Sequence, residues 1–429
     1  MNNTAQQYDI IIIGGGMVGA CTALALAQLD LSIAVIDKFV FDASQQPSFD
    51  DRSVALSYGS MRILQSLGLA DAIKSVAEPI KHIHVSDRGH YGFTRLHADE
   101  FKIDALGYVV ENLRAGRAFY RMIEQSKLID VIAPAKISRV DNSQSGVVVK
   151  YQLPEAEQTG SVSAKLLVAA DGTQSVVADF LNMDSKSEAY RQSAAIANVT
   201  TAKSHNGWAY ERFTDSGPLA MLPLTDRRLS LVWSFDNDQI DHMKALTDEQ
   251  FIAALQERFG YRLGAITRVG KRSFYPLQQK RLLQGWTTRV VFIGNALHTC
   301  HPVAGQGFNL GIRDIAQLTE NIAFALRVGD NFFSDDFLRY FIEQRQPDIE
   351  QTLAATDSLT RLFINNYTPL VVARNIALKA LDSLPMFKAM FAEQAMGIND
   401  QLPALARGMS VKQLSQLPIP NVMTDMTSV

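Results

Sequence analysis

The sequence has 429 residues, of which 47% are hydrophobic and 20% are charged, a composition typical of a globular protein with room for two or three domains. Its net charge of -3, without any run of lysines and arginines, excludes nucleic acid as the partner. The two cysteines, Cys21 and Cys300, are too few and too far apart for a disulfide framework or a zinc site, and they fit a reducing, cytoplasmic setting.

The stretch from Tyr8 to Lys38 predicts a strand, a glycine turn, a helix and a second strand. Ile10 to Ile13 is a short β-branched run, typical of a buried parallel strand. Three glycines follow in the G-x-G-x-x-G spacing: Gly14, Gly16 and Gly19. This spacing provides a tight turn, close approach of the backbone to a pyrophosphate at the helix N-terminus, and close helix packing. Asp37 ends the second strand where a ribose-binding carboxylate is expected, so the unit predicts dinucleotide binding.

The same region raises the alternative of membrane insertion. Ile10 to Leu29 carries no charge and is long enough for a transmembrane helix or a signal peptide. Three consecutive glycines in its first third, the lack of a basic segment before it, and Asp30 directly after it argue against that alternative. We therefore expect no spanning segment here.

Two further positions are candidates for ligand contacts. A predicted buried strand runs into Asp171-Gly172, which would place a carboxylate at the carboxyl edge of a sheet, where α/β folds bind ligands. Asp-Gly is also a common turn dipeptide, and read alone it predicts only a turn. Arg52 precedes a predicted helix, where it would either solvate the helix start or reach a diphosphate.

A second strand and turn unit extends from Arg289 to Asp314. Val290 to Ile293 predicts a buried strand, and the loop after it contains a proline and several glycines that let the backbone approach a flat ligand. His298 and His301 are three residues apart, as metal ligands can be, but no third ligand is near, so we expect no metal.

The rest of the chain divides into a β-rich part and a helical part. Ala194 to Phe235 alternates as strands do, and Leu246 to Phe259 predicts a helix. Much of 334–395 predicts helices with apolar stripes, which either pack in the core or dock on lipid or on a partner enzyme. Arg374 and Lys379, set among apolar residues, would suit an anionic interface if the second alternative holds.

Taken together, the three separated motifs resemble, in order and over nearly the whole chain, the FAD-dependent aromatic monooxygenases of the p-hydroxybenzoate hydroxylase type. Within that family, four stretches are similar to the ubiquinone-biosynthesis hydroxylases: DDRSVALSYGS, HVSDRGHYGF, ERFTDSGPLAMLPL and HPVAGQGFNLGIRD. The resemblance implies FAD as the cofactor, NAD(P)H as a transient electron donor, and hydroxylation of a polyprenyl phenol, 2-polyprenyl-6-methoxyphenol, with O2.

The resemblance also assigns cofactor-binding residues. Those implied for the ADP half of FAD are Gly14, Gly16, Gly19 and Asp37, with Arg52 and Arg117 near the diphosphate and Asp171 at the ribityl or ADP region. Those implied to line the isoalloxazine are Pro302, Gly305, Gly307 and Asn309.

Two positions depart from the family pattern, and the catalytic base is not identified. Asn295 stands where the family usually has aspartate, so the expected ribityl contact is an amide contact. Ala178 stands where a basic residue is usual, which affects that position's suggested link to the nicotinamide nucleotide. The candidates for the base that deprotonates the phenol are His301 and Tyr275.

The implied fold is α/β, a Rossmann-like FAD-binding domain with a β-rich substrate domain and a C-terminal helical region. We expect the FAD-binding domain at 1–80, 106–185 and 278–330, the substrate domain at 81–105 and 186–277, and the helical region at 331–429. The expected location is cytoplasmic, with peripheral contact on the inner face of the membrane and with a ubiquinone-biosynthesis complex. Three alternatives stay open: a sibling hydroxylase acting on another carbon or on a soluble phenol, a non-catalytic flavoprotein scaffold, and an NAD-dependent dehydrogenase.

Overall fold

The first sheet is built around β1 (Gln6–Ile13), in which Ile10, Ile11 and Ile12 are completely buried, as the apolar run predicts. The computed structural model describes residues 6–40, 52–154, 159–300, 305–365, 367–398 and 403–418. The strand order is β18-β19-β11-β1-β2-β8, with β10 and β9 added beside β11. Its other strands are β2 (Ile33–Ile36), β8 (Ile129–Ile132), β9 (Lys136–Ser143), β10 (Gly146–Gln152), β11 (Thr159–Ala169), β18 (Trp286–Thr287) and β19 (Val290–Phe292).

The register of the first sheet brings three strand ends together. β1, β11 and β19 run parallel, with Ile13 opposite Ala169 and Ala169 opposite Phe292. Their carboxyl ends therefore meet at one edge, where ligands bind in sheets of this kind. The helices that pack near this sheet are α1 (Met17–Ala27), α2 (Tyr58–Ser66), α3 (Ala70–Lys74), α4 (Asn112–Gln125), α5 (Val176–Phe180) and α8 (Gln306–Val328).

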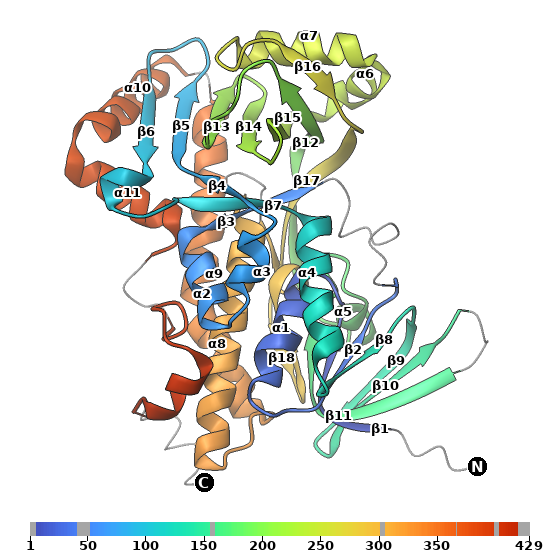
Figure 1. Cartoon of the computed structure of the whole chain (residues 1–429). Helices are drawn as coiled ribbons and strands as arrows, with labels where there is room; N and C mark the ends of the chain where they lie inside the picture. The colour runs from blue at the N-terminus through green and yellow to red at the C-terminus, as the bar shows by residue number, and fades with distance from the viewer. Residues whose placement is uncertain are drawn as a thin grey trace.

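The second sheet lies above the first in Figure 1 and is largely antiparallel, with the order β20-β17-β12-β15-β14-β13-β5-β6 and β16 beside β12. Its strands are β5 (His82–Asp87), β6 (Phe93–His97), β12 (Ser185–Thr201), β13 (Trp208–Thr214), β14 (Gly217–Pro223), β15 (Arg228–Asp236), β16 (Ile266–Val269), β17 (Ser273–Leu282) and β20 (His298–Thr299). One face, the outer face, packs Leu231 and Trp233 against α7 (Asp248–Phe259), next to α6 (Ile240–Ala245).

The opposite face of the second sheet, which we call the inner face, is defined by Ile196, Glu211, Ala220, Val232 and Tyr275. These residues alternate with the outer-face residues along their strands. The long helix α9 (Asp335–Ile364) packs against β13 and β14. A third sheet of β3 (Ser53–Ser57), β7 (Gly107–Glu111) and β4 (Glu78–Ile80) lies between the two large sheets, and β4 contacts β14.

The C-terminal helices α10 (Thr368–Ser383) and α11 (Pro385–Met396) cover the edge strand β6. Asp382 accepts a hydrogen bond from the Arg95 amide at 2.9 Å, which caps an edge donor of that strand. Beyond them, the last described segment returns to the first core, where Leu405 and Leu414 are completely buried.

The structure corrects the predicted role of Arg374. Only 5% of this residue is exposed, and its guanidinium pairs with Asp87 of β5 at 2.8 Å. It also donates to the carbonyls of Leu362, Phe363 and Asn365. A buried arginine with these partners holds α10 on β5, so it is no part of a basic docking surface, although Lys379 is exposed as expected.

Two boundaries also differ from the sequence prediction. Arg52 leads into strand β3 and not into a helix, because Ser53 to Ser57 pairs with β7 before α2 begins. β17 continues to Leu282 in the second sheet, past the predicted domain boundary at 277, since it pairs along the start of β12. The full domain boundaries remain a prediction. Within the described residues no helix is both long and apolar enough to cross a membrane.

Candidate functional site

The first glycine turn lies at the end of β1 and requires glycine at two positions. Gly14 has φ +97°, and a Cβ there would lie 2.6 Å from the Ala170 carbonyl oxygen at the end of β11. A Cβ on Gly19 would lie 1.8 Å from the Gly14 carbonyl oxygen. The turn and the first helical residues are therefore in backbone contact, as the glycine spacing predicts.

Helix α1 begins at this turn without a side-chain cap. Gly16 is the N-cap residue, and no side chain of the described residues accepts a hydrogen bond from the first amides. Uncapped amides and the helix dipole make this terminus suited to an anion. Arg117, predicted to lie near a diphosphate, is exposed on α4, one turn before a tyrosine that binds the same glycine turn.

Asp37 and Tyr120 fix the turn from two sides. The Asp37 carboxylate accepts hydrogen bonds from the Gly15 amide at 2.5 Å and the Phe39 amide at 2.8 Å. Burial raises the pKa of Asp37 above its ordinary value, although these two bonds act against the shift. The Tyr120 hydroxyl donates to the Gly15 carbonyl. The carboxylate predicted to bind a ribose thus lies directly beside the glycine turn.

Asp171 stands at the end of β11 beside Gly14. Its Oδ2 accepts a hydrogen bond from the Val177 amide at 3.2 Å, while Oδ1 is buried and has no hydrogen-bond partner among the described residues. Burial raises the pKa of this carboxyl group, against several hydrogen bonds that lower it. A buried acceptor without a partner is costly, and a ligand hydroxyl would satisfy it.

The second glycine turn, at the end of β19, packs on the first unit. Gly294 has φ +57°, and a Cβ there would lie 3.1 Å from Val18 of α1. Asn295 is exposed, and its side-chain oxygen lies near Gly307, where an added Cβ would be 3.8 Å away. Two predicted cofactor contacts, Gly14 and Asn295, therefore lie at turns that pack on the same unit, and a third, Gly307, lies in the first turn of α8 next to Asn295.

A buried charged cluster holds the second glycine turn, at Gly294, in place. Asp314 is completely buried and accepts hydrogen bonds from the Gly294 amide at 2.9 Å and from Arg345 at 2.7 Å. His298 contacts the same carboxylate at 2.7 Å. Burial alone would raise the pKa of Asp314, but His298 and Arg345 lower it to about 2. The turn is thus held by an ionised carboxylate and not by packing alone.

Asn309 connects α8 to strand β3. Its side-chain oxygen accepts a hydrogen bond from the Ser57 amide at 2.9 Å, and its nitrogen donates to the carbonyls of Ala55 at 2.8 Å and Gly305 at 2.9 Å. These bonds fix the loop that begins α8, whose N-cap Gly305 has φ +61°. The amide is engaged with backbone, so a direct contact of Asn309 with a flavin ring remains a prediction. His301 and Pro302 lie outside the described residues.

Arg52 and Tyr275 join the third sheet to the inner face. The guanidinium carbon of Arg52 lies 5.2 Å from the centroid of the Tyr275 ring, a cation–π contact. Tyr275 is partly exposed, and its place on the inner face keeps it a candidate for substrate contact. Of the two proposed bases, it is the one whose position the structure describes.

The residues fit FAD as a bound cofactor. The uncapped helix terminus suits the pyrophosphate, Asp37 suits a ribose, and the partnerless Asp171 oxygen suits a hydroxyl of the ribityl or ribose groups. An added Cβ would overlap the Ala170 backbone at Gly14, and at Gly294 it would make a tight contact with the Val18 side chain. Among the described residues, no group of three His, Cys, Asp or Glu side chains is arranged to hold a metal ion.

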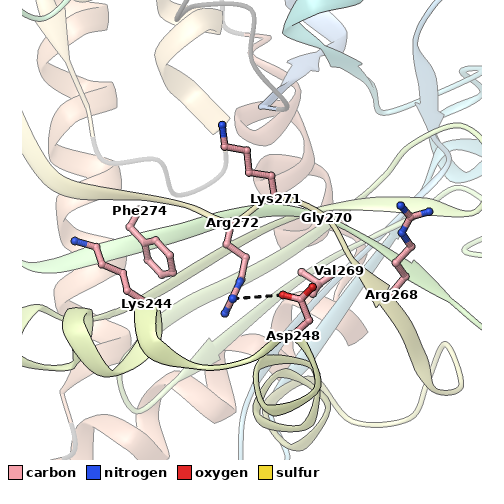
Figure 2. A pocket seen from close by; sticks show the side chains of 8 residues that line it. All are labelled: Lys244, Asp248, Arg268, Val269, Gly270, Lys271, Arg272 and Phe274. Atoms are coloured by element: carbon pink, nitrogen blue, oxygen red, sulfur yellow. Dashed lines mark ion pairs between the residues drawn. The ribbon is translucent and has the colours of Figure 1, made fainter.

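Figure 2 shows a pocket elsewhere, between β16, the start of β17, and helices α6 and α7. In this view Arg272 is directed at Asp248, with a nitrogen-to-oxygen distance of 3.3 Å. The lining is mostly basic: it contains Lys244, Arg268, Lys271 and Arg272. None of the predicted cofactor residues lines this pocket, so it is separate from the glycine turns.

Comparison with known proteins agrees with this site. A family described as "FAD binding domain" matches residues 7–353. The chain is 34% identical to "Ubiquinone hydroxylase UbiL" of Rhodospirillum rubrum, over 93% of this chain and 92% of that protein. It is 30% identical to "3-demethoxyubiquinol 3-hydroxylase" of Escherichia coli, over 92% of this chain and 100% of that protein.

A solved structure shares the fold. The p-nitrophenol 4-monooxygenase PnpA of Pseudomonas putida superposes with a TM-score of 0.74 at 17% identity, over 92% of this chain and 99% of that chain. The chain belongs to the FAD-binding domain family, and it is an FAD-dependent monooxygenase. This result confirms two predictions from the sequence: the resemblance to FAD-dependent monooxygenases and the α/β fold class.

Sequence reasoning missed two residues that hold the glycine turns, Tyr120 and Asp314, and one residue of the inner face, Glu211. Tyr120 gives no local signal, because a tyrosine on an amphipathic helix reads as ordinary core. Asp314 is the last residue of the stretch HPVAGQGFNLGIRD. Its place on the buried side of the predicted helix could have indicated a charged support for the turn. Glu211 also lies inside a quoted motif, at a strand position whose alternation places it on the inner face.

Proposed function

We propose that this monooxygenase hydroxylates the ring of 2-polyprenyl-6-methoxyphenol in ubiquinone biosynthesis, using O2 and a reduced nicotinamide nucleotide. The observation that carries the proposal is the similarity, over at least 92% of this chain and of each relative, to a protein named ubiquinone hydroxylase and to one named 3-demethoxyubiquinol 3-hydroxylase, at 34% and 30% identity. The glycine turns and Asp171 supply a site that suits FAD.

The inner face of the second sheet provides evidence for the proposal that the substrate is apolar and aromatic. Ile196, Ala220 and Val232 lie in one row across three strands and are only partly buried, whereas their outer-face neighbours are buried against α7. Partial exposure in the middle of a sheet, under α9 and the third sheet, means that packing there is incomplete. A phenol ring with its alkyl substituents would fill such space with apolar contacts.

Bound FAD would supply the activation of O2, and the chain's own residues have the tasks of binding, orientation and water exclusion. Arg52 on Tyr275 and Asn309 on β3 join the loop before α8 to the second sheet. In the proposed arrangement, these contacts would hold the flavin side at a constant distance from the inner face. Fixed geometry contributes to rate because the reacting groups then meet in one arrangement.

We also propose that the enzyme contacts the membrane surface, since a polyprenyl tail resides in lipid. The support is a set of exposed apolar side chains on and next to α10 and α11. They are Tyr367, Leu370, Val372, Ile376, Leu384, Met386, Phe387 and Met390. Such a surface on helices that already cover an edge strand suits a lipid interface.

Quinone-intermediate profiling in a deletion strain tests the proposed reaction. The strain should accumulate the 6-methoxyphenol and lose ubiquinone, and the wild-type gene should restore it. Accumulation of a different ring intermediate would assign the enzyme to another carbon. With purified protein, NADPH oxidation should depend on the phenol, and a soluble phenol that is turned over faster than the prenylated one would contradict the proposed substrate.

A further inference from the structure

Glu211 is an acidic residue within an aliphatic stretch of the inner face. On β13 it lies opposite Ala220 of β14 and Val85 of β5, and the same row continues to Val232 and Ile196. Between Val85 and Ile196 every other member of this row is aliphatic, and polar residues stand at its two ends, Thr94 of β6 and Ser273 of β17. A carboxylate in such a row is unfavourable for packing, so its presence requires a reason other than stability.

The Glu211 side chain has no hydrogen bond or ion pair among the described residues. It is partly exposed, yet protein surrounds it closely enough that burial raises its pKa to about 7. No neighbouring charge contributes to this shift. We interpret the remaining exposure as exposure to unfilled space against the inner face.

Several charged groups on the elements around Glu211 are paired with other residues. On β5, Asp87 pairs with Arg374 of α10 at 2.8 Å. On α9, Asp357 pairs with Arg361 at 2.8 Å. At the far end of the same face, Arg52 stacks on Tyr275. Glu211 is therefore available to a ligand in a way that these residues are not.

We propose that Glu211 accepts the proton of the substrate's phenolic hydroxyl. This inference rests on the proposed function, since it requires a phenol on the inner face. In the step, the phenol O–H bond breaks, an O–H bond forms on the carboxylate, and the negative charge moves to the phenolate oxygen. No oxidation state changes. The resulting phenolate is more electron-rich and more easily hydroxylated.

The surroundings of Glu211 suit a proton acceptor. A phenol has an ordinary pKa of about 10, as tyrosine does. A base acts best when its own pKa lies near the working pH, and desolvation is a usual way to raise that of a carboxyl group. The aliphatic row around Glu211 provides this desolvation without a competing cation. General bases contribute about 100-fold to 10,000-fold to a rate.

The test is the Glu211→Gln variant of the FAD-loaded enzyme, which keeps the shape of the side chain and removes its basicity. With a short-tailed 2-methoxyphenol as substrate, kcat of the wild type should rise with pH and level off above about 7. At pH 7 the variant should lose at least about 100-fold in kcat. Its remaining rate should keep rising toward the pKa of the phenol itself.

Two further measurements separate proton transfer from a structural role. A fluorinated phenol, which ionises at lower pH, should restore most of the variant's rate, whereas a packing defect would not respond to the substrate's acidity. FAD content and the flavin spectral change on phenol binding should stay as in the wild type. Glu343→Gln, at an exposed position of α9, is the matched control and should leave the pH profile unchanged.

An unchanged rate and pH profile in Glu211→Gln would overturn the proposal, as would equal loss of rate with ordinary and fluorinated phenols. If the wild type itself does not hydroxylate the phenol, the proposed function fails, and that result is visible before any variant is compared.

Discussion

The glycine-turn region and the inner face of the second sheet are the two halves of the proposed site, and they are built differently. At the turns the backbone itself forms the surface, and an added Cβ at Gly14 would overlap the backbone of Ala170. On the inner face the surface consists of alternating side chains from several strands. The glycine turns therefore tolerate almost no amino-acid substitution, whereas single side chains on the inner face can be substituted without moving the backbone.

The largest effect on FAD binding is expected from Gly14→Ala. Alanine in this left-handed conformation costs about 1–2 kcal/mol, and the overlap with Ala170 adds to that. FAD affinity should fall by at least about 30-fold, measured by flavin absorbance after dialysis. Gly68→Ala is the control, because Gly68 also has positive φ but nothing lies within 4 Å of its added Cβ. Equal FAD retention by both variants would contradict a backbone-built site.

Asp314→Asn tests the charged support beneath the second turn. The change leaves the buried Arg345 with one carboxylate fewer, so the free energy of unfolding should fall by about 3–5 kcal/mol. Denaturant unfolding measures this, with the exposed Asp336→Asn as the control, for which we expect less than about 1 kcal/mol. A small loss in Asp314→Asn would show that packing holds the turn.

The same residue predicts acid sensitivity. The folded-state pKa of Asp314 is about 2, below its ordinary 3.8, so its contribution is present above about pH 4 and is lost as pH falls toward 2. The loss should be about 2 kcal/mol in the wild type. The slope of stability against pH between 4 and 2 should be smaller in Asp314→Asn. Identical slopes would remove Asp314 from this role.

Gly305→Ala tests the loop that joins the two halves. Gly305 and Gly329 stand at opposite ends of α8 with φ +61° and +72°, so alanine should cost each about 1 kcal/mol of stability. Only at Gly305 would the new methyl group approach another element, 3.2 Å from Ala55 of β3. Hydroxylation should therefore decrease in Gly305→Ala and stay near wild type in Gly329→Ala. Equal rates would place the loop away from the reaction.

The smallest change in stability is expected outside both halves, from Ile376→Ser combined with Met390→Ser. These side chains are 65% and 61% exposed, so unfolding should change by less than about 0.5 kcal/mol. FAD content and turnover of a short-tailed phenol should stay unchanged, while co-flotation with anionic vesicles should decrease. Unaltered flotation would assign this surface to something other than lipid.

The contrast between the halves also explains what the sequence predicts. Gly14, Asp37 and Asp171 follow strand ends, and the order of local signals was sufficient to place them near one ligand. Arg374 and Glu211 acquire their roles from strands and helices distant in the chain, and a single local pattern does not report which partner they meet. From its local sequence Arg374 is predicted to be an exposed basic residue, whereas in the fold it pairs with Asp87 of β5. Ser53 to Ser57 reads as helix until β7 pairs with it.

The path of the chain has a consequence for how such enzymes diversify. β19 belongs to the first sheet, yet β20, only a few residues later, pairs with β17 of the second, and β5 and β6 are inserted between elements of the first core. Neither sheet is formed by one continuous segment of the chain, so recombination could not exchange a whole sheet as one piece. Point changes at every second residue of β12 to β15 would alter the inner face and leave the packing on α7 as it was.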